Sequence, residues 1–379
     1  MKITAVNVFS VEGGLRSGEA LYETERLGLA PLEATPYRAT FTEIETDAGF
    51  TGLCYGGSAA VAALGSSLIG EDPLAIEYLW EKMYTGTYTR LERLPALSAI
   101  NCALWDLAGK VRGEPVYRLL GGPTQRRVRA YAGMLGYATT PERAAEASRL
   151  AVAQGFGALK WYLTFNASAG EEGLAWNVAT IRAVREAVGP DVEIMVDWLL
   201  ADPTENSLLY AIRLARRLEE FEPTWIEEPL PFDAQEAHLR LARATRIPLA
   251  YGEHFCGRWQ IKELLDLGAA SVLQPETMVA GGISEMKRIQ TVASLYGVPI
   301  VPHGNESGYI VPHLLFSAPA SIAPLCEWGI KINANVQYFN AAEFHPVDGY
   351  FMPPEGPGLG YVLNEERVER RTPILPASH

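Results

Sequence analysis

A series of ionisable residues, each ending a short apolar segment, is the strongest chemical signal in the sequence. Successive members lie 23 to 30 residues apart, an interval that one strand and one helix would fill. The spacing predicts a βα repeat that brings one polar group per unit to the same end of a sheet. The members of the series are Asp197, Glu227, Glu253, Glu276, His303 and Glu327.

Three of these residues, Asp197, Glu227 and Glu253, are carboxylates that end consecutive predicted strands. In a closed (β/α) barrel such strand ends meet at one mouth, where catalytic groups lie. Neighbouring carboxylates repel one another unless a cation is bound, and oxygen ligands favour Mg²⁺, with Mn²⁺ as a substitute. Salt bridges to lysine or arginine are the alternative, but three acids on consecutive strand ends favour a metal site.

Three further strand ends suggest a proton-transfer apparatus. The segment LKWY places Lys160 and Tyr162 on the same side of the second strand. A carboxylate substrate held between Mg²⁺ and Lys160 would be stabilised as an enediolate when its α proton is removed. His303 is a candidate base or acid because its intrinsic pKa is close to neutrality, and Glu276 can accept the hydrogen of its Nδ1.

The remaining candidates allow simpler interpretations. Glu327 is either a protonated hydrogen-bond donor to the enediolate or an ordinary buried acid. No C-x-x-C pair occurs among the four cysteines, so small buried side chains in a reducing cytoplasm are expected. A structural role is predicted for the other histidines, His238, His254, His313, His345 and His379.

Alternation of short strands with amphipathic helices predicts an α/β barrel over residues 123–328. Eight strands favour a closed TIM-type barrel over an open doubly wound sheet, and no G-x-G-x-x-G follows the first strand. The expected strands are VRAYAG, ALKWY, EIMVD, TWIEE, PLAYGE, SVLQPE, PIVPH and PLCEW. The expected helices cover residues 171–188, 206–220, 234–245, 258–268, 282–296 and 312–318.

The segments on either side of the barrel have a different pattern. Residues 1–122 predict an α+β capping domain, with strands at 2–9 and 38–46 and helical periodicity between 73 and 112. A surface loop is expected over residues 14–35. Residues 329–379 are turn-rich and are expected to leave the barrel and pack back on the capping domain.

Composition excludes several classes of protein. The 379 residues are 48% apolar and 20% charged, as in ordinary globular proteins, and the formal net charge is −13. Such acidity argues against binding to nucleic acid or to an anionic membrane. Neither a signal peptide pattern nor a run of 18 apolar residues occurs, so we expect a cytoplasmic protein without transmembrane helices.

A series of short motifs along the chain resembles, in its order and spacing, that of the enolase superfamily, in particular the mandelate-racemase-like branch of acid-sugar dehydratases. They are TEIETDAGFTG and ALWDLAGKVRGEPVYRLLGG before the barrel, LKWY, VD, WIEEP, GEH, QPE, GG, PHG and CEW within it, and DGYFMPPEGPGLG after it. The resemblance implies a modified (β/α)7β barrel with a capping domain, whose loops within 14–35 and 52–58 close over the substrate. It also implies a homo-oligomer, from dimer to octamer.

The resemblance assigns a role to each candidate residue. It implies Mg²⁺ on the three acids named above, a His303–Glu276 dyad, a carboxylate contact from Lys160, and an electrophilic role for Glu327. Three positions depart from the family pattern. Glu276 stands where Asp is usual, Tyr162 replaces the second lysine that racemases use as a base, and Leu199 stands where a polar residue often follows the first metal ligand.

One-sided chemistry is the simplest prediction, since a phenol with a pKa of about 10 is a poor base at neutral pH. We therefore expect a dehydratase that removes the α proton and the 3-hydroxyl of an aldonate or related sugar acid to give a 2-keto-3-deoxy acid. His303 would be the base, the acid for the departing hydroxyl, or both. The WIEEP, GEH and VPHG context resembles rhamnonate-dehydratase-like members. A racemase, epimerase or cycloisomerase of the same fold, and a non-catalytic metal-dependent sugar-acid binder, are the alternatives.

Overall fold

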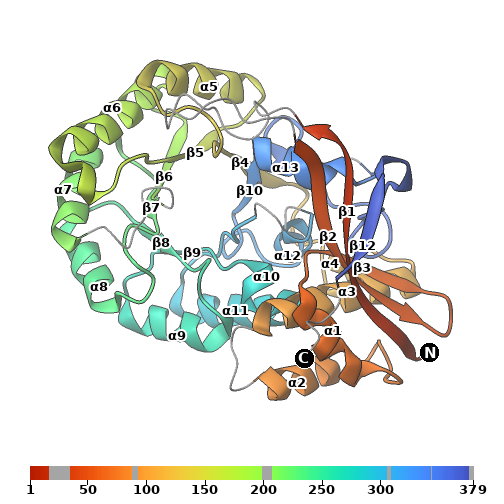
Figure 1. Cartoon of the computed structure of the whole chain (residues 1–379). Coiled ribbons are helices and arrows are strands. Elements are labelled where there is room, and N and C mark those ends of the chain that lie inside the picture. The colour runs from red at the N-terminus through yellow and green to blue at the C-terminus, as the bar shows by residue number, and fades with distance from the viewer. Residues whose placement is uncertain (17–34, 88–92, 199–206, 305–308, 343, 375–379) are drawn as a thin grey trace.

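A ring of parallel strands surrounded by helices forms the larger part of the molecule, and an antiparallel sheet with its own helices lies against one side of it (Figure 1). The computed structural model describes residues 1–16, 35–87, 93–198, 207–304, 309–342 and 344–374. Within these ranges, no helix is both long and apolar enough to cross a membrane.

The N-terminal unit, here called the capping unit, is built on a four-stranded antiparallel sheet. In spatial order its strands are β12 (Arg370–Pro373), β1 (Ile3–Arg16), β2 (Thr35–Thr46) and β3 (Thr51–Tyr55). Its helices are α1 (Ala59–Gly65), α2 (Ile76–Thr87), α3 (Leu94–Arg112) and α4 (Val116–Leu119). Both β1 and β2 are longer than predicted, because their antiparallel pairing continues as far as Arg16 and Thr35. Helix α3 packs on β3 and ends at Gly113, whose left-handed φ of 69° suits a residue without Cβ.

The predicted modified barrel is confirmed. Its parallel strands are β4 (Val128–Gly133), β5 (Ala158–Tyr162), β6 (Glu193–Asp197), β7 (Trp225–Glu227), β8 (Leu249–Tyr251), β9 (Val272–Leu273) and β10 (Leu325–Gly329), and β10 pairs with β4. The segment predicted as the seventh strand is held by isolated bridges that join Leu273 to Ile300 and Glu276 to His303. A 2.7 Å hydrogen bond from Ile300 N to Ile322 O continues the ring towards β10.

Helices surround this ring. Their bounds are α5 (Pro141–Ala153), α6 (Gly170–Val188), α7 (Leu208–Leu218), α8 (Gln235–Ala244), α9 (Gly257–Leu267), α10 (Thr277–Ala280), α11 (Gly282–Tyr296) and α12 (Val311–Phe316). Where a range was predicted, the bounds agree within two residues. No range was predicted for α5 or for α10, which is only one turn long and too short to show a helical period.

The C-terminal segment contains more regular structure than predicted. Residues after β10 form α13 (Ile330–Tyr338), although this stretch was expected to be turn-rich. Strand β11 (Tyr350–Phe351) then pairs with β4 of the barrel, and β12 pairs with β1 of the N-terminal sheet. Burial against these neighbours provides the stability that the weak local pattern does not indicate.

A layer of apolar side chains fills the barrel below its mouth. Each of the eight positions around the ring contributes one buried residue to this layer. Because side chains alternate along a strand, the residues further along each strand point into the mouth. The layer consists of Tyr131, Ala158, Met195, Trp225, Ala250, Val272, Val301 and Leu325. This layer closes the barrel beneath the polar groups described below.

Buried His313 joins the N-terminal unit to the C-terminal segment. Its Nδ1 accepts a 3.1 Å hydrogen bond from Tyr117 N in α4, and its Nε2 lies 3.2 Å from Leu359 O. An accepting Nδ1 requires the neutral ring. Burial lowers the pKa of His313 from 6.5 to about 4.

This lowered pKa predicts a loss of stability in mild acid. The contribution of neutral His313 is complete above the unfolded-state pKa of about 6.5 and falls by about 3 kcal/mol as the pH approaches 4. Urea unfolding at pH 7 and pH 4.5 should show this loss in the wild type. His313→Asn cannot titrate but keeps an acceptor and a donor, so its stability should depend less on pH. Equal pH dependence in the two proteins would contradict the assignment.

Gly282, at the start of α11, predicts a second stability difference. Its φ is +78°, and a Cβ there would lie 2.6 Å from Asn101 Oδ1 in α3. Gly297, which ends the same helix, has a φ of +67° but nothing within 4 Å. Gly282→Ala should therefore lower the free energy of unfolding by about 3 kcal/mol and Gly297→Ala by about 1 kcal/mol. Equal losses in urea titrations would show that the contact with α3 is not tight.

Candidate active site

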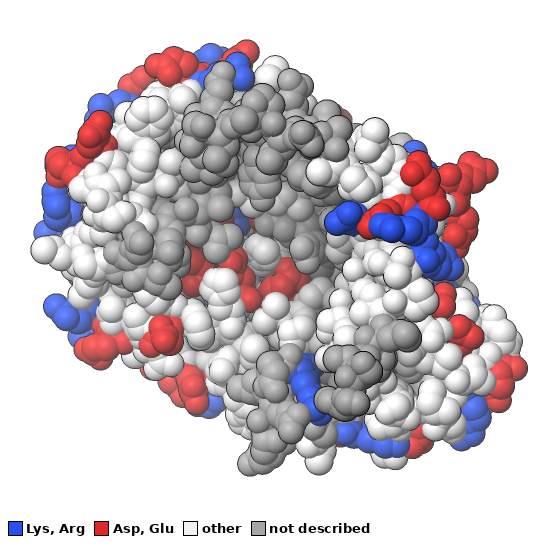
Figure 2. Space-filling view, in the orientation of Figure 1, with Lys and Arg blue, Asp and Glu red and all other residues white. Residues whose placement is uncertain are grey.

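The polar residues predicted at the strand ends are brought together at one end of the barrel. Figure 2 shows acidic side chains gathered in a hollow near the centre of this face. In the parallel pairing, Tyr162 lies opposite Asp197, and Asp197 lies opposite Glu227. All the predicted site residues except His303 are at least nine-tenths buried, and the His303 side chain is 16% exposed.

Lys160 lies at the centre of the acidic group. Its Nζ is 2.6 Å from Glu227 Oε1, 2.9 Å from Glu327 Oε1 and 3.2 Å from Asp197 Oδ2. Burial disfavours the ammonium, but Glu227 and Glu327 outweigh it and raise the pKa of Lys160 well above its ordinary value. A permanent positive charge therefore lies among three carboxylates.

Glu227 is surrounded by donors on both of its oxygens. Its Oε1 faces Lys160, while its Oε2 accepts hydrogen bonds from Gln274 Nε2 at 2.8 Å and from Trp225 Nε1 at 3.2 Å. Gln274 and Trp225 were not predicted as residues of the site. Their spacing is the signal that could have revealed them, since Trp225 precedes Glu227 by two residues and Gln274 precedes Glu276 by two.

His303 and Glu276 form the predicted pair. The distance from His303 Nδ1 to Glu276 Oε2 is 2.8 Å, and the segments that carry them meet at a parallel bridge. The other oxygen of Glu276 accepts a 3.0 Å hydrogen bond from Met278 N and so caps α10. One carboxylate thus orients the imidazole and begins a helix.

Glu253 faces the imidazole from the side opposite Glu276. Its Oε2 lies 3.5 Å from His303 Nε2, and its Oε1 lies 3.3 Å from His254 Nε2. Burial disfavours the His303 cation, but the Glu253 charge and the Glu276 hydrogen bond raise its pKa well above the usual value. Such a histidine is a strong base once its proton has left.

Glu327 is held between a backbone amide and Lys160, and its predicted role towards the substrate stays a prediction. Its Oε2 accepts a 2.9 Å hydrogen bond from Gly304 N, and its Oε1 faces Lys160. Although burial raises the pKa of Glu327, the charges of Lys160 and His303 lower it below the ordinary value. These two contacts allow the side chain to orient Lys160.

The Tyr162 hydroxyl donates to the backbone carbonyl of Tyr137, in the loop after β4. The ring of Tyr137 in turn faces Lys331 Nζ at 4.3 Å. Leu199 and most of the predicted loop at 14–35 lie outside the described residues. Of the loop predicted within 52–58, the residues as far as Tyr55 belong to β3, because they pair with β2. Cys54 Sγ in this strand lies 4.0 Å from Met278 Sδ in α10.

The residues of the mouth fit a divalent cation by their chemistry. Five buried carboxylates face one lysine and one histidine here, which leaves an excess of negative charge. Within the described residues, no three acidic, histidine or cysteine side chains converge as a metal centre, because Asp197 and Glu227 turn to Lys160 and Glu253 turns to His303. The oxygen donors at adjacent strand ends are nevertheless of the chemical type that Mg²⁺ prefers.

Comparison with known families agrees with this architecture. A family model described as the N-terminal domain of mandelate racemase / muconate lactonizing enzyme matches residues 34–121, and one described as enolase C-terminal domain-like matches residues 142–367. The chain therefore belongs to the enolase superfamily and to its mandelate racemase / muconate lactonizing enzyme family. It is an enzyme of that family.

Named relatives act on sugar acids and their lactones. Arabinonate dehydratase of Saccharolobus solfataricus is 32% identical, with 90% of this chain and 93% of the relative covered. D-galactonate dehydratase of Cronobacter sakazakii is 33% identical, with 89% and 92% covered. D-galactarolactone cycloisomerase of Agrobacterium fabrum is 34% identical, with 97% and 98% covered.

Solved structures show the same arrangement. The 3,6-anhydro-D-galactonate cycloisomerase from Zobellia galactanivorans superposes with a TM-score of 0.80 at 26% identity, covering 98% of this chain and all (100%) of that chain. A member of the enolase superfamily from Salmonella Typhimurium also has a TM-score of 0.80, at 27% identity, with 98% and 99% covered. The similarity extends over the capping unit as well as the barrel.

The position of Lys160 predicts a large stability effect. Lys160→Met should lower the free energy of unfolding without divalent ions by about 3 kcal/mol or more, because buried carboxylates would lose their counter-ion. Lys82 pairs with Glu71 at 2.5 Å where both side chains are about one-third exposed, so Lys82→Met should have little effect. Urea titrations in EDTA compare the two variants, and similar small losses would contradict the central role of the Lys160 charge.

Proposed function

We propose that the protein is a Mg²⁺-dependent dehydratase of a sugar acid. It removes the α proton of an aldonate or a related acid and eliminates the 3-hydroxyl to give a 2-keto-3-deoxy acid. The observation that carries this proposal is the asymmetry of the mouth. On one side His303 is held by Glu276 at 2.8 Å, whereas on the other side the Tyr162 hydroxyl is bound to a backbone carbonyl.

Asp197, Glu227 and Glu253 would hold the metal ion. When bound, Mg²⁺ would act as a Lewis acid for the substrate carboxylate and balance the charge that develops in the enediolate. Lys160 would contact the same carboxylate, with Glu327 and Glu227 orienting its ammonium. A fixed positive charge in a buried site stabilises the developing negative charge without reorganisation.

His303 would carry both proton transfers. With Nδ1 donating to Glu276 Oε2, neutral His303 has a free electron pair on Nε2 that can accept the α proton. The enediolate then expels the 3-hydroxyl, which takes that proton from His303 and leaves as water. The imidazole is restored in that step, so no second base is needed. The resulting enol becomes the 2-keto-3-deoxy acid when its hydroxyl proton passes to solvent and C3 takes a proton from solvent.

Cycloisomerisation is the second candidate. It is favoured by the relative from Agrobacterium fabrum, which is 34% identical over nearly the whole chain and acts on D-galactarolactone. The same α-proton removal by His303 would begin that reaction. Racemisation is less well supported, because a base is required on each face and the Tyr162 hydroxyl is engaged with Tyr137 O.

Incubation with a panel of aldonates and aldarates in MgCl₂ tests the proposal by colorimetric assay of 2-keto-3-deoxy acids. We expect turnover that EDTA abolishes. His303→Asn should lower kcat by at least about 10³-fold, whereas Tyr162→Phe should stay within about tenfold of the wild type.

Other products would identify the alternatives. Exchange of the α proton in deuterium oxide without keto-acid formation would replace dehydration by epimerisation, and turnover of lactones alone would indicate cycloisomerisation. Tight Mg²⁺-dependent binding of a sugar acid with no exchange would show a binding protein.

A further inference from the structure

The one-turn helix α10 connects the His303–Glu276 pair to the capping unit. It begins after Glu276, whose backbone carbonyl accepts from Val279 N at 3.0 Å and Ala280 N at 2.8 Å. It ends at Gly281, which has a φ of +123° and leads directly into α11. A single hydrogen-bonded turn is short and stiff, so a displacement of Gly281 is transmitted to Glu276.

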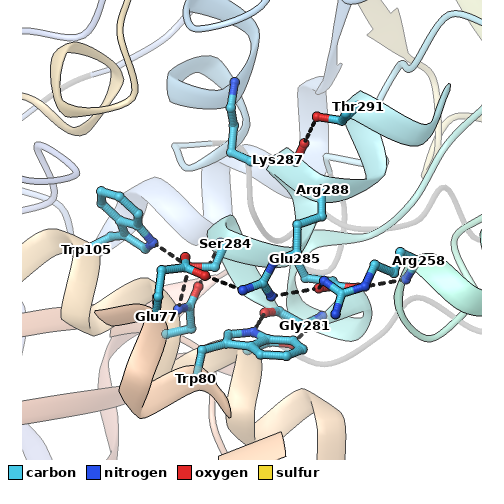
Figure 3. A network of polar contacts seen from close by, with 12 residues as sticks. Glu77, Trp80, Trp105, Arg258, Gly281, Ser284, Glu285, Lys287, Arg288 and Thr291 are labelled. Carbon is cyan, nitrogen blue, oxygen red and sulfur yellow. Dashed lines mark hydrogen bonds and ion pairs between the residues drawn. The ribbon is translucent and has the colours of Figure 1, made fainter. Parts of the chain in front are cut away.

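Side chains of the capping unit hold both polar groups of the Gly281 backbone. Trp80 Nε1, in α2, donates to Gly281 O at 2.9 Å, and Ser98 Oγ, in α3, accepts from Gly281 N at 3.0 Å. Asn101 Oδ1 accepts a 3.0 Å hydrogen bond from Ser284 N, in the first turn of α11. Figure 3 shows Trp80 reaching Gly281 and Trp105 reaching Ser284 from the capping helices.

Trp80 is itself fixed by charged side chains of the barrel. The guanidinium groups of Arg288 and Arg258 lie 4.2 Å and 5.6 Å from its ring. Both arginines pair at 3.0 Å with Glu285, which is buried (Figure 3). Since Trp80 is 1% exposed, its ring has no freedom to follow a displaced Gly281.

We propose that Trp80 and Ser98 are positioning residues for His303, acting through α10 and Glu276. The proposal rests on the proposed function, in which His303 moves the proton. Glu276 uses one oxygen for Met278 N at 3.0 Å and the other for His303 Nδ1 at 2.8 Å. A shift of α10 therefore strains one of these two bonds, and the docking of the capping unit sets the orientation of the imidazole.

Contacts from β3 and from the residue that follows it support the same coupling. Cys54 Sγ lies 4.0 Å from Met278 Sδ, and a Cβ on Gly56 would lie 2.8 Å from Met278 Cε. The capping unit thus contacts α10 at Met278, near its start, as well as at Gly281, where it ends. Two separate contacts on so short a helix leave it little room to rotate.

Trp80→Phe and Ser98→Ala test the proposal, because each deletes one hydrogen bond to Gly281 and keeps most of the packing. We expect kcat to fall about tenfold with KM within about twofold, since small errors in catalytic geometry slow the reaction more than they weaken binding. Glu77→Gln is the matched control. It removes a 63% exposed partner of Arg288 at the same interface but no bond to Gly281, so kcat should not change.

The His303 Nδ1 proton gives a readout independent of activity. In ¹⁵N-histidine-labelled enzyme without substrate, Trp80→Phe and Ser98→Ala should shift or broaden this resonance, and Glu77→Gln should not. An unchanged resonance together with unchanged kcat in both positioning variants would overturn the proposal. If the wild type dehydrates no sugar acid, the proposed function fails, and the resonance alone decides the coupling.

A double-mutant cycle separates positioning from general destabilisation. In the Glu276→Ala background the side chain that transmits the effect is gone, so adding Ser98→Ala should lower kcat less than about twofold. A tenfold loss in both backgrounds would show that Ser98 acts by another route and would overturn the proposal. Thermal unfolding of each variant, run in parallel, confirms that folded enzyme is compared.

Discussion

The concentration of negative charge at the barrel mouth is the constraint on which the site depends. Lys160 Nζ lies within 3.2 Å of Asp197, Glu227 and Glu327, above an apolar layer that excludes water. In such surroundings charges interact strongly, and an unpaired carboxylate would be costly. The positions of the acids are thus determined by a cation of the chain itself.

Glu276 shows a second constraint, because one carboxylate makes two contacts. A carboxylate with one methylene more than the aspartate usual in this family keeps its 2.8 Å contact with His303 and also caps α10. The longer side chain is therefore tied to the presence of a helix immediately after it. Since α10 ends against Trp80 and Ser98, the capping unit contacts the helix that Glu276 caps.

Asymmetry of the mouth follows from a backbone contact. The Tyr162 hydroxyl donates to Tyr137 O, so the side of the barrel where racemases carry a lysine presents a weak acid that is already bound. His303, with Glu276 and Glu253 on its two nitrogens, is the titratable group suited to proton transfer. This difference between the two sides favours elimination over inversion.

Periodicity along the sequence was sufficient to predict the barrel, its capping unit and the strand-end residues that meet at the mouth. Apolar residues recur every second residue in a strand and every 3.6 residues in a helix, and both periods arise from local backbone geometry. Periodicity did not reveal α13, the bridges that stand in place of the seventh strand, or the contact of Glu327 with Lys160. These depend on neighbours from elsewhere in the chain. Asn101 and Ser284, for example, are separated by 183 residues. The sequence by itself determined which chemical groups reach the mouth, whereas only the tertiary structure decided how they pair, because hydrogen bonds and burial between distant segments leave no local period.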